Sequence, residues 1–324
     1  MSRGPAGAGP YGSGLLVVDK PAGLTSHDVV ARVRRLAGAR RVGHAGTLDP
    51  AATGILVLGL DKGTKLLGHL ALGDKDYAAT IRLGRSTVTD DADGEVTGGA
   101  SAAQVSEADV RAGLARLTGT IAQVPSAVSA IKVDGKRSYA RVRAGEQVEL
   151  AARTVTVSVL DLVELRRPSP DLPDLLDLDV RVTCTSGTYI RALARDLGAA
   201  LGVGGHLTAL RRTRVGSYDL AQATTLAELA ERVESGQPLP LVPLGAAVAA
   251  AFQRVDVDAE VARGVGHGHP LPLPAGAAAA PSGGSGGASV YGVFGPDGAV
   301  LALMSPKEGL LRSLVVFPPD DLER

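Results

Sequence analysis

The sequence has few of the residues that build disulfides and metal sites. Cys184 is its one cysteine among 324 residues, which excludes a disulfide framework, a cysteine-rich zinc site and the paired cysteines of a zinc deaminase. Its six histidines show no H-E-x-x-H or comparable spacing. We therefore expect a protein without a metal site.

Long hydrophobic runs and an excess of charge of one sign are also missing. The longest apolar runs, ILVLGL and GAAVAAAF, are too short to cross a bilayer. The first fourteen residues hold no apolar segment typical of a secretory signal, so we expect a cytoplasmic protein. The 34 basic and 34 acidic side chains give a net charge of zero, which excludes a strongly basic nucleic-acid binder but permits a local basic face.

The common nucleotide-binding motifs are absent as well. The sequence contains no G-x-x-x-x-G-K-[ST], and no G-x-G-x-x-G opens a helix. The first absence excludes a phosphate-binding loop of that type, and the second argues against a dinucleotide site.

The order of the expected elements points to an α+β fold. Hydrophobic residues make up 45% of the chain, enough for a real core, and the length suggests about two domains. Several strands follow one another without a helix long enough for a crossover, which favours a mixed or antiparallel central sheet.

The composition changes near residue 250. The stretch 271–289 is of low complexity, and Asp297-Gly298 after it reads as the turn of a hairpin. We predict a disordered N-terminus at 1–13, a large domain at 14–248, and a small β-rich domain at 249–324 with a flexible loop at 271–289.

Two helices have recognisable starts. Ser26 is placed to cap a helix that Gly38 ends, and Ser106 with Asp109 forms a capping box before a second apolar stripe. The segment 76–84 alternates as a strand does, which puts Tyr77 on its apolar face. On that pattern Tyr77 is equally a core residue or an exposed aromatic face.

The stretch RRVGHAGTLDPAATGILVLGL is the densest in potential chemistry. Gly43, Gly46 and Gly54 permit a tight loop with positive φ angles. Pro50 pushes Asp49 toward an extended backbone, so Asp49 sits at a fixed bend just before a buried strand. An Asx turn or a helix cap is one reading of Asp49. A preorganised carboxylate that acts as nucleophile or base is the other.

Three basic segments could follow the phosphates of a nucleic acid, or could be ordinary solvated faces. Arginine outnumbers lysine 27 to 7, which suits phosphate contact. The residues are Arg32, Arg34, Arg35, Arg40 and Arg41, then Lys132, Lys136, Arg137, Arg141 and Arg143, and finally Arg211, Arg212 and Arg214.

Six segments resemble one family in order and spacing. GHAGTLDPAATGIL resembles the catalytic motif of the TruB-type tRNA pseudouridine synthases. The other segments, within residues 14–215, are GLLVVDKPAGLTSHDVV, KDYAATIRLGRSTVTDDADGE, VPSAVSAIKVDGKRSYARVRAGE, TCTSGTYIRALARDLG and HLTALRRTRVG. The C-terminal region is similar to the family's small PUA-like RNA-binding domains only in size and strand content.

The resemblance implies the pseudouridine synthase fold and an isomerase that converts uridine to pseudouridine at position 55 in the T-loop of tRNA, without cofactor. It implies that the excursion at about 123–146 grips RNA, and that the protein works as a monomer without an obligate protein partner. Position by position, Asp49 matches the catalytic aspartate and Tyr77 the tyrosine that stacks on the target base. Tyr189 and Arg191 match a pair beside that base, His44 a contact to the rearranged loop, and Lys20 and Leu210 pocket-lining positions.

Two alternatives stay open at this point. One is a non-catalytic RNA-binding or RNA-folding protein on the same scaffold, which would not need Asp49. The other is a guide-RNA-dependent synthase in a multi-protein particle, against which the excursion at 123–146 argues. How Asp49 would act is also open: by attack on the sugar C1′, by attack on the base, or by removing a ribose proton.

Overall fold

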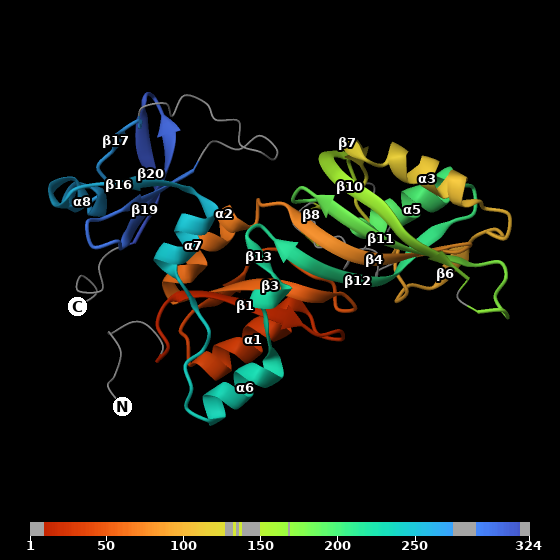
Figure 1. Cartoon of the computed structure of the whole chain (residues 1–324), viewed down its shortest axis with the longest axis horizontal. Coiled ribbons are helices and arrows are strands. Elements are labelled where there is room, and N and C mark those ends of the chain that lie inside the picture. The colour runs from red at the N-terminus through yellow and green to blue at the C-terminus, as the bar shows by residue number, and fades with distance from the viewer. Residues whose placement is uncertain are drawn as a thin grey trace. The chain divides into compact units, whose positions relative to one another are not determined.

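The computed structural model describes residues 10–126, 132–133, 136–137, 150–167, 169–274 and 290–317. The chain forms two compact units (Figure 1). Unit 1 comprises Met1–Gly73 and Arg214–Arg324, and unit 2 comprises Asp74–Thr213. Predictions for residues 1–9 and 275–289, for Arg141, and for the side chains of Lys132, Lys136 and Arg137 lie outside the described residues.

Unit 1 joins the two ends of the chain. Its first part contains β1 (Gly14–Lys20), α1 (Ser26–Ala37), β2 (Val42–His44), β3 (Thr53–Leu60), η1 (Asp61–Leu66) and α2 (Leu67–Leu70). Its second part contains β13 (Tyr218–Asp219), η2 (Leu220–Gln222), β14 (Thr224–Thr225), α6 (Leu226–Glu234), β15 (Val242–Pro243), α7 (Leu244–Ala251), β16 (Gln253–Asp256), α8 (Ala259–Gly266), β17 (Leu271–Pro272), β18 (Tyr291–Phe294), β19 (Val300–Lys307) and β20 (Leu310–Val316).

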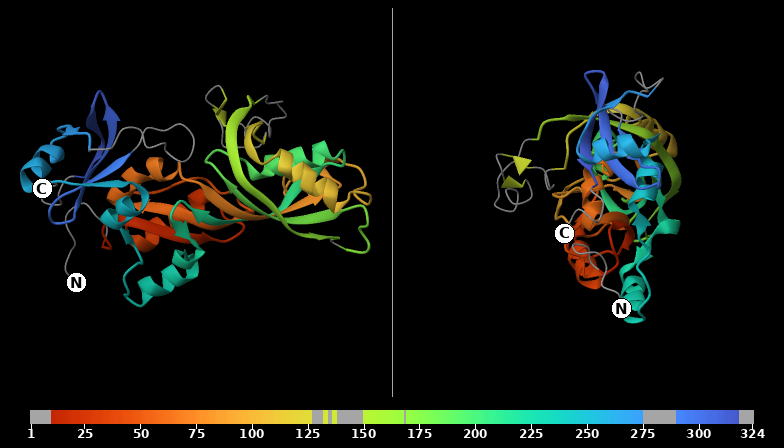
Figure 2. Two further views of the ribbon diagram at one scale, coloured as in Figure 1. Left: turned by 45° about the horizontal axis from the view of Figure 1, so that its top comes forward. Right: turned by 90° about the vertical axis from the view of Figure 1, so that its left-hand side faces the viewer.

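The sheet of unit 1 is covered on both faces. Strand β1 runs antiparallel to β3 and parallel to β14, so the sheet is mixed. Leu16 and Val18 pack with the apolar faces of α1 and α6, which lie side by side (Figures 1 and 2). Leu15 and Val17 pack on the opposite face with residues of α7 and the C-terminal strands. Burial on both faces explains why these strands read as continuous hydrophobic runs.

The C-terminal strands form a separate five-stranded sheet in the order β16-β18-β19-β20-β17. The predicted hairpin is confirmed, since β18 and β19 pair antiparallel. Gly298 has φ +75° in its turn, and its N–H donates to the Gly295 carbonyl over 2.9 Å. This small β-rich sheet agrees with the fold class expected for the C-terminal region.

Unit 2 is built on a sheet of long strands in the order β12-β4-β11-β10-β7. In this sheet β11 runs antiparallel to both β4 and β10, and β10 runs antiparallel to β7. Its elements are β4 (Lys75–Leu83), β5 (Ser86–Thr87), β6 (Val96–Gly98), α3 (Glu107–Arg116), β7 (Gly119–Gln123), β8 (Lys132–Val133), β9 (Lys136–Arg137), β10 (Arg153–Arg166), β11 (Leu176–Cys184), α5 (Ile190–Ala200) and β12 (Gly205–Val215), whose last two residues belong to unit 1.

The predicted alternation of β4 is confirmed, because Tyr77, Ala79, Ile81 and Leu83 are all buried. The capping box at Ser106 and Asp109 is confirmed as well. Mixed, mostly antiparallel sheets with helices packed on them make the fold α+β, as the sequence predicts. No helix in the described ranges is long and apolar enough to cross a membrane.

The predicted cap of α1 is wrong by one residue. Thr25, not Ser26, is the N-cap: its hydroxyl accepts from the Asp28 N–H, and the Asp28 carboxylate accepts from the Thr25 N–H over 2.9 Å. The predicted end at Gly38 is confirmed by its left-handed φ of 54°. Both Thr25 and Ser26 are capping residue types, so the sequence alone could not choose between them.

Candidate active site

Asp49 lies half-buried in an irregular loop between β2 and β3. Gly46 and Gly54 have φ angles of +90° and +97°, as the sequence predicts. Gly43 differs, because it lies in β2 and has no positive φ. A Cβ there would come within 2.8 Å of a terminal methyl group of Leu67, so a larger residue at this position would displace that side chain.

Ser26 fixes the residue before Asp49. Its hydroxyl donates to the Leu48 carbonyl over 3.1 Å and accepts from the Leu48 N–H over 2.9 Å. The Ser26 side chain is almost fully buried, so these bonds form away from competing water. Both backbone groups of Leu48 are therefore held from the first turn of α1.

Lys20 and Gly23 fix the residue after Asp49. The Pro50 carbonyl accepts from the Lys20 ammonium over 3.0 Å and from the Gly23 N–H over 2.9 Å. Lys20 is fully buried, and its ammonium also donates to the carbonyls of Pro21 and Leu24 over 2.9 and 2.7 Å. A buried charge is tolerated when its donors are satisfied in this way.

The loop thus presents Asp49 on a backbone held at both neighbours. The carbonyl of Asp49 itself accepts from the Ala52 N–H over 3.1 Å, which closes the turn. A carboxylate on such a backbone loses little freedom when it meets a substrate, as a preorganised nucleophile or base requires.

His44 ends β2 and is half-buried. Its ring stands edge-on to the ring of His27, with centroids 5.5 Å apart and an interplanar angle of 84°. His27 is exposed in the first turn of α1. Sequence reasoning missed this neighbour of His44, because the two residues are seventeen positions apart and only the fold pairs them.

In unit 2, Tyr77 is buried on β4, with 7% of its surface exposed. Lys75 lies on the same face of the strand and pairs in register with Cys184 of β11. Burial and, to a lesser extent, the nearby charge of Arg212 lower the pKa of Lys75 to about 8. Burial raises the pKa of the Cys184 thiol to about 11, which leaves it protonated and unreactive at neutral pH.

Tyr189 and Arg191 stand at the start of α5. Tyr189 is its N-cap, and Arg191 is buried in its first turn. The Arg191 guanidinium donates to the Thr89 carbonyl over 2.6 Å and lies 3.4 Å from the Asp91 carboxylate. Sequence reasoning missed the Asp91 contact, although the acidic run TDDADG was the available signal.

The basic residues predicted to contact RNA differ in exposure. Arg40 and Arg41 are exposed after α1, and Arg211 is half-buried on β12 beside the half-buried Leu210. Arg212 is only 1% exposed, which contradicts the surface position that a phosphate contact requires. Side chains alternate between the two faces of a strand, so Arg211 and Arg212 point to opposite faces of β12.

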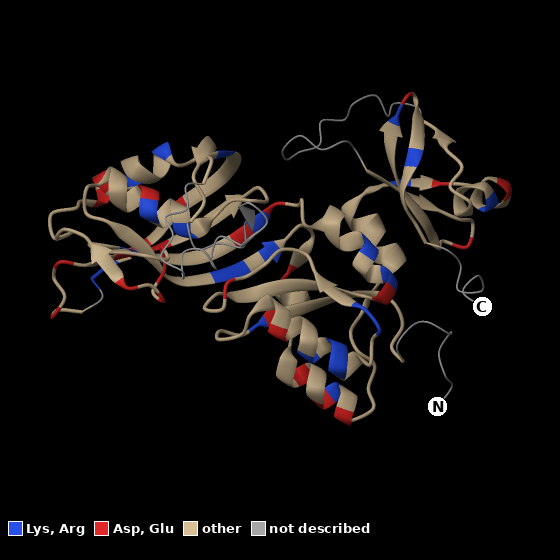
Figure 3. Ribbon diagram, turned by 180° about the vertical axis from the view of Figure 1, so that it is seen from behind, with Lys and Arg blue, Asp and Glu red and all other residues tan. Residues whose placement is uncertain are grey.

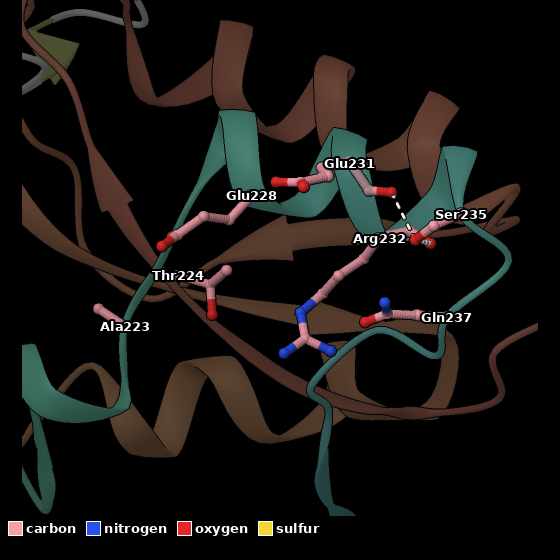
Figure 4. Close-up of a pocket in the computed structure, with 7 residues that line it drawn as sticks. All are labelled: Ala223, Thr224, Glu228, Glu231, Arg232, Ser235 and Gln237. Carbon is pink, nitrogen blue, oxygen red and sulfur yellow. Dashed lines mark hydrogen bonds between the residues drawn. The ribbon is translucent and has the colours of Figure 1, made fainter.

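Charge elsewhere on unit 1 is of both signs. Helices α1 and α6 each contain acidic and basic residues (Figure 3). A pocket of about 320 Å³ beside α6 is lined by polar residues such as Glu231, Arg232 and Gln237 (Figure 4). None of the candidate site residues lines this pocket. Within the described ranges, no three histidine, cysteine or acidic residues come together as metal ligands.

Three family models match the chain in succession. Residues 34–190 match the TruB family pseudouridylate synthase N-terminal domain. Residues 191–240 match the tRNA pseudouridylate synthase B C-terminal domain, and residues 252–318 match the tRNA pseudouridine synthase II C-terminal region.

Two solved structures share the fold across most of the chain. The crystal structure of a Cbf5-Nop10-Gar1 complex has a TM-score of 0.71 at 26% identity, covering 95% of this chain and 86% of that one. The structure of an H/ACA RNP bound to a substrate RNA containing 2'-deoxyuridine has a TM-score of 0.68 at 25% identity, with the same coverage.

Sequence relatives are much closer. The tRNA pseudouridine synthase B of Streptomyces griseus subsp. griseus is 56% identical over 94% of this chain and 97% of its own length. That of Thermobifida fusca is 58% identical over 94% of this chain and 98% of its own length. The chain therefore belongs to the TruB family and is a tRNA pseudouridine synthase, an isomerase.

Proposed function

We propose that this enzyme isomerises the uridine at position 55 in the T-loop of tRNA, and that Asp49 is its catalytic residue. One observation carries the proposal: Asp49 sits between two backbone positions that Ser26, Lys20 and Gly23 hold by hydrogen bonds. An Asp that only shaped a turn would not need its loop fixed from a buried lysine and a buried serine.

The isomerisation needs no external reactant. The bond between N1 and the ribose C1′ breaks, and a bond between C5 and C1′ forms. The proton on C5 leaves to a base, and N1 takes up a proton. Atoms and charge balance without an oxidant or a cofactor. The Asp49 carboxylate supplies the nucleophile or the base, by attack on C1′, by attack on the uracil ring, or by removal of a ribose proton.

The flipped uridine needs an aromatic surface and polar neighbours. Removing a base from its stack costs a few kcal/mol, part of which stacking on Tyr77 returns. Tyr189 and Arg191 lie beside the base, His44 contacts the rearranged loop, and Leu210 lines the pocket. Lys20, which the resemblance also assigned to the pocket, acts from below its surface by holding the backbone after Asp49. Phosphates of the T-arm bind to Arg40, Arg41, Lys132, Lys136, Arg137, Arg141 and Arg211.

The proposed organisation follows from this function. Residues 14–248 form the catalytic domain, and residues 249–324 form a PUA-like domain that adds contacts to tRNA. The enzyme acts as a monomer in the cytoplasm, where its substrate is found. The relatives named tRNA pseudouridine synthase B match along 97–98% of their own length, which favours a stand-alone tRNA enzyme over a guide-RNA-dependent one.

Asp49→Asn tests the proposed catalytic role. The amide keeps the size but is a much poorer nucleophile or base, so turnover should fall below a few per cent while tRNA affinity stays within about threefold. Release of tritium from C5-labelled tRNA measures turnover, and filter binding measures affinity. Asp161→Asn, at an exposed position of β10, is the matched control and should keep full activity.

The position is tested with the RNA rather than the protein. A transcript in which uridine 55 is replaced by cytidine should release no tritium in the presence of the wild-type enzyme. Continued release from this transcript would contradict position 55 as the target. An Asp49→Asn variant that still turned over at more than a few per cent of the wild-type rate would remove Asp49 from its role.

A further inference from the structure

We propose that Gln123, the last residue of β7, is a positioning residue for the start of α5, where Tyr189 and Arg191 lie. The inference rests on the proposed function to the extent that those two residues are assigned to the substrate site. Gln123 itself acts through the backbone of Tyr189.

The contact is a pair of reciprocal hydrogen bonds. The Gln123 Oε1 accepts from the Tyr189 N–H over 2.8 Å, and the Gln123 Nε2 donates to the Tyr189 carbonyl over 3.1 Å. Gln123 is 2% exposed, so water does not compete for these bonds. Two bonds of opposite sense to one residue fix the rotation of its backbone, as a pair of residues in an antiparallel sheet does.

The start of α5 depends on this support. A helix N-terminus leaves its first N–H groups without partners inside the helix. In the part of the chain that the structure describes, the Tyr189 side chain makes no capping hydrogen bond to the helix. The turn before it contains Gly187 at φ +87° and is closed by the Thr188 hydroxyl, which donates to the Thr185 carbonyl over 2.9 Å. The Gln123 bonds add support from β7 at the next residue, Tyr189.

A second set of contacts ties the same elements together one turn further along. Arg195 of α5 donates to the Val124 carbonyl over 2.7 Å and lies 3.3 Å from the Asp90 carboxylate. Asp90 adjoins Asp91, the carboxylate that faces Arg191. The end of β7, the first two turns of α5 and the segment at 89–91 thus brace one another.

Such bracing matters because catalysis is sensitive to small displacements. A shift of about 1 Å in a group that orients the substrate can cost about 100-fold in rate. Losing the Gln123 bonds would free the Tyr189 peptide to rotate, and Arg191 two residues later would move with it. The chemical step should then slow, while phosphate contacts made elsewhere keep the tRNA bound.

Gln123→Met tests the proposal. Methionine keeps the length and volume of the buried side chain but cannot make either hydrogen bond. We expect the single-turnover rate at saturating tRNA to fall about 10- to 100-fold, with the Kd for tRNA within twofold of the wild type. Rates are expressed per folded enzyme, with folding measured by thermal unfolding of the full chain.

Arg167→Ala is the control for a purely structural loss. Arg167 also lies in unit 2, and its guanidinium donates to the carbonyls of Ala102, Ala103, Pro173 and Leu175, none of which is a candidate site residue. We expect Arg167→Ala to lower Tm while leaving the rate per folded enzyme unchanged.

A double-mutant cycle with Arg191→Lys completes the test. If Gln123 acts through the first turn of α5, the double variant should be no more than about threefold slower than the slower single variant, because the two changes damage one arrangement. Three results would overturn the proposal. The first is a double variant whose loss of rate equals the product of the two single losses. The others are an unchanged rate in Gln123→Met and a loss of tRNA affinity equal to the loss of rate. Asp49→Asn judges the proposed function separately from this result.

Discussion

Lys75 and Cys184 show how burial sets the chemistry of single residues. They pair across β4 and β11, on the buried face of β4 that also carries Tyr77. Burial opposes the charged form of both groups, so it lowers the pKa of the lysine and raises the pKa of the thiol. At neutral pH the pair is an ammonium and a neutral thiol, and the buried ammonium costs stability.

Because the buried Lys75 loses its charge at alkaline pH, we predict that the free energy of unfolding of the protein rises there. The pKa of Lys75 is about 8 in the folded protein, against 10.5 as the ordinary value. The unfolded chain thus binds more protons between these two values, and the cost of the buried charge disappears as pH rises through that window. Relative to Lys75→Met, the free energy of unfolding of the wild type should rise by up to about 3 kcal/mol from pH 7.5 to pH 10.5. Urea unfolding at both pH values measures it, and a constant difference would contradict the assigned pKa.

Tyr77 poses a different question, because its burial fits both a core residue and a stacking surface. We expect Tyr77→Phe to keep tRNA affinity, since the ring remains. Tyr77→Ala should weaken the complex by roughly 1–3 kcal/mol, the usual contribution of stacking on one base. Filter binding and tritium release separate binding from turnover. Loss of Tm without loss of affinity per folded enzyme would make Tyr77 a core residue only.

At the scale of elements, Thr25 and Ser26 divide two tasks between adjacent hydroxyl groups. Thr25 caps α1, whereas Ser26 reaches into the Asp49 loop and holds Leu48. The helix and the loop are thereby joined: the first turn of α1 serves as the support on which the loop rests.

This division predicts opposite outcomes for two neighbouring substitutions. Thr25→Ala should cost about 1 kcal/mol of stability, as the loss of an N-cap does, with little change in rate. Ser26→Ala leaves the cap in place but frees the backbone of Leu48, so turnover should fall about tenfold or more. Thermal unfolding of both variants measures the loss of stability, and their single-turnover rates measure the loss of activity. Equal effects of the two variants on rate would show that the loop does not depend on Ser26.

At the scale of the whole molecule, the C-terminal strands share a core with the N-terminal sheet inside unit 1. Phe294 of β18 and Leu303 of β19 belong to the same buried cluster as Leu15 and Val17 of β1. Val248 of α7 joins them. The C-terminal strands thus contribute buried apolar residues to the core of unit 1.

Phe294→Ala should consequently loosen strands distant in sequence. Removing a fully buried phenylalanine costs about 3–5 kcal/mol, and hydrogen exchange of β1 amides should accelerate together with that of β18. Leu314→Ala, at a position 47% exposed, should change stability by less than about 0.5 kcal/mol and leave β1 protected. Acceleration confined to residues 252–317 would mean that the C-terminal strands unfold independently.

The sequence by itself determined the local elements and the identity of the chemistry. Alternation placed Tyr77 on the buried face of β4, the pair Ser106 and Asp109 started α3, and Asp297-Gly298 formed the turn between β18 and β19. These features depend on neighbours within a few positions, so they are readable from a single chain. The six motif segments are also short stretches of contiguous sequence, so the resemblance to the family could be recognised without a structure.

Only the tertiary structure decided which residues support the site. Lys20 and Ser26 lie 30 and 22 positions from the carbonyls of Pro50 and Leu48 that they bind, and Gln123 lies 66 positions from Tyr189. The burial of Arg212 could not be predicted from the sequence either, because a run of basic residues does not show which of them face solvent and which face the core. Each of these contacts depends on which strands and helices pack together. That packing is determined by burial of apolar residues from the whole chain, and no single segment contains the information.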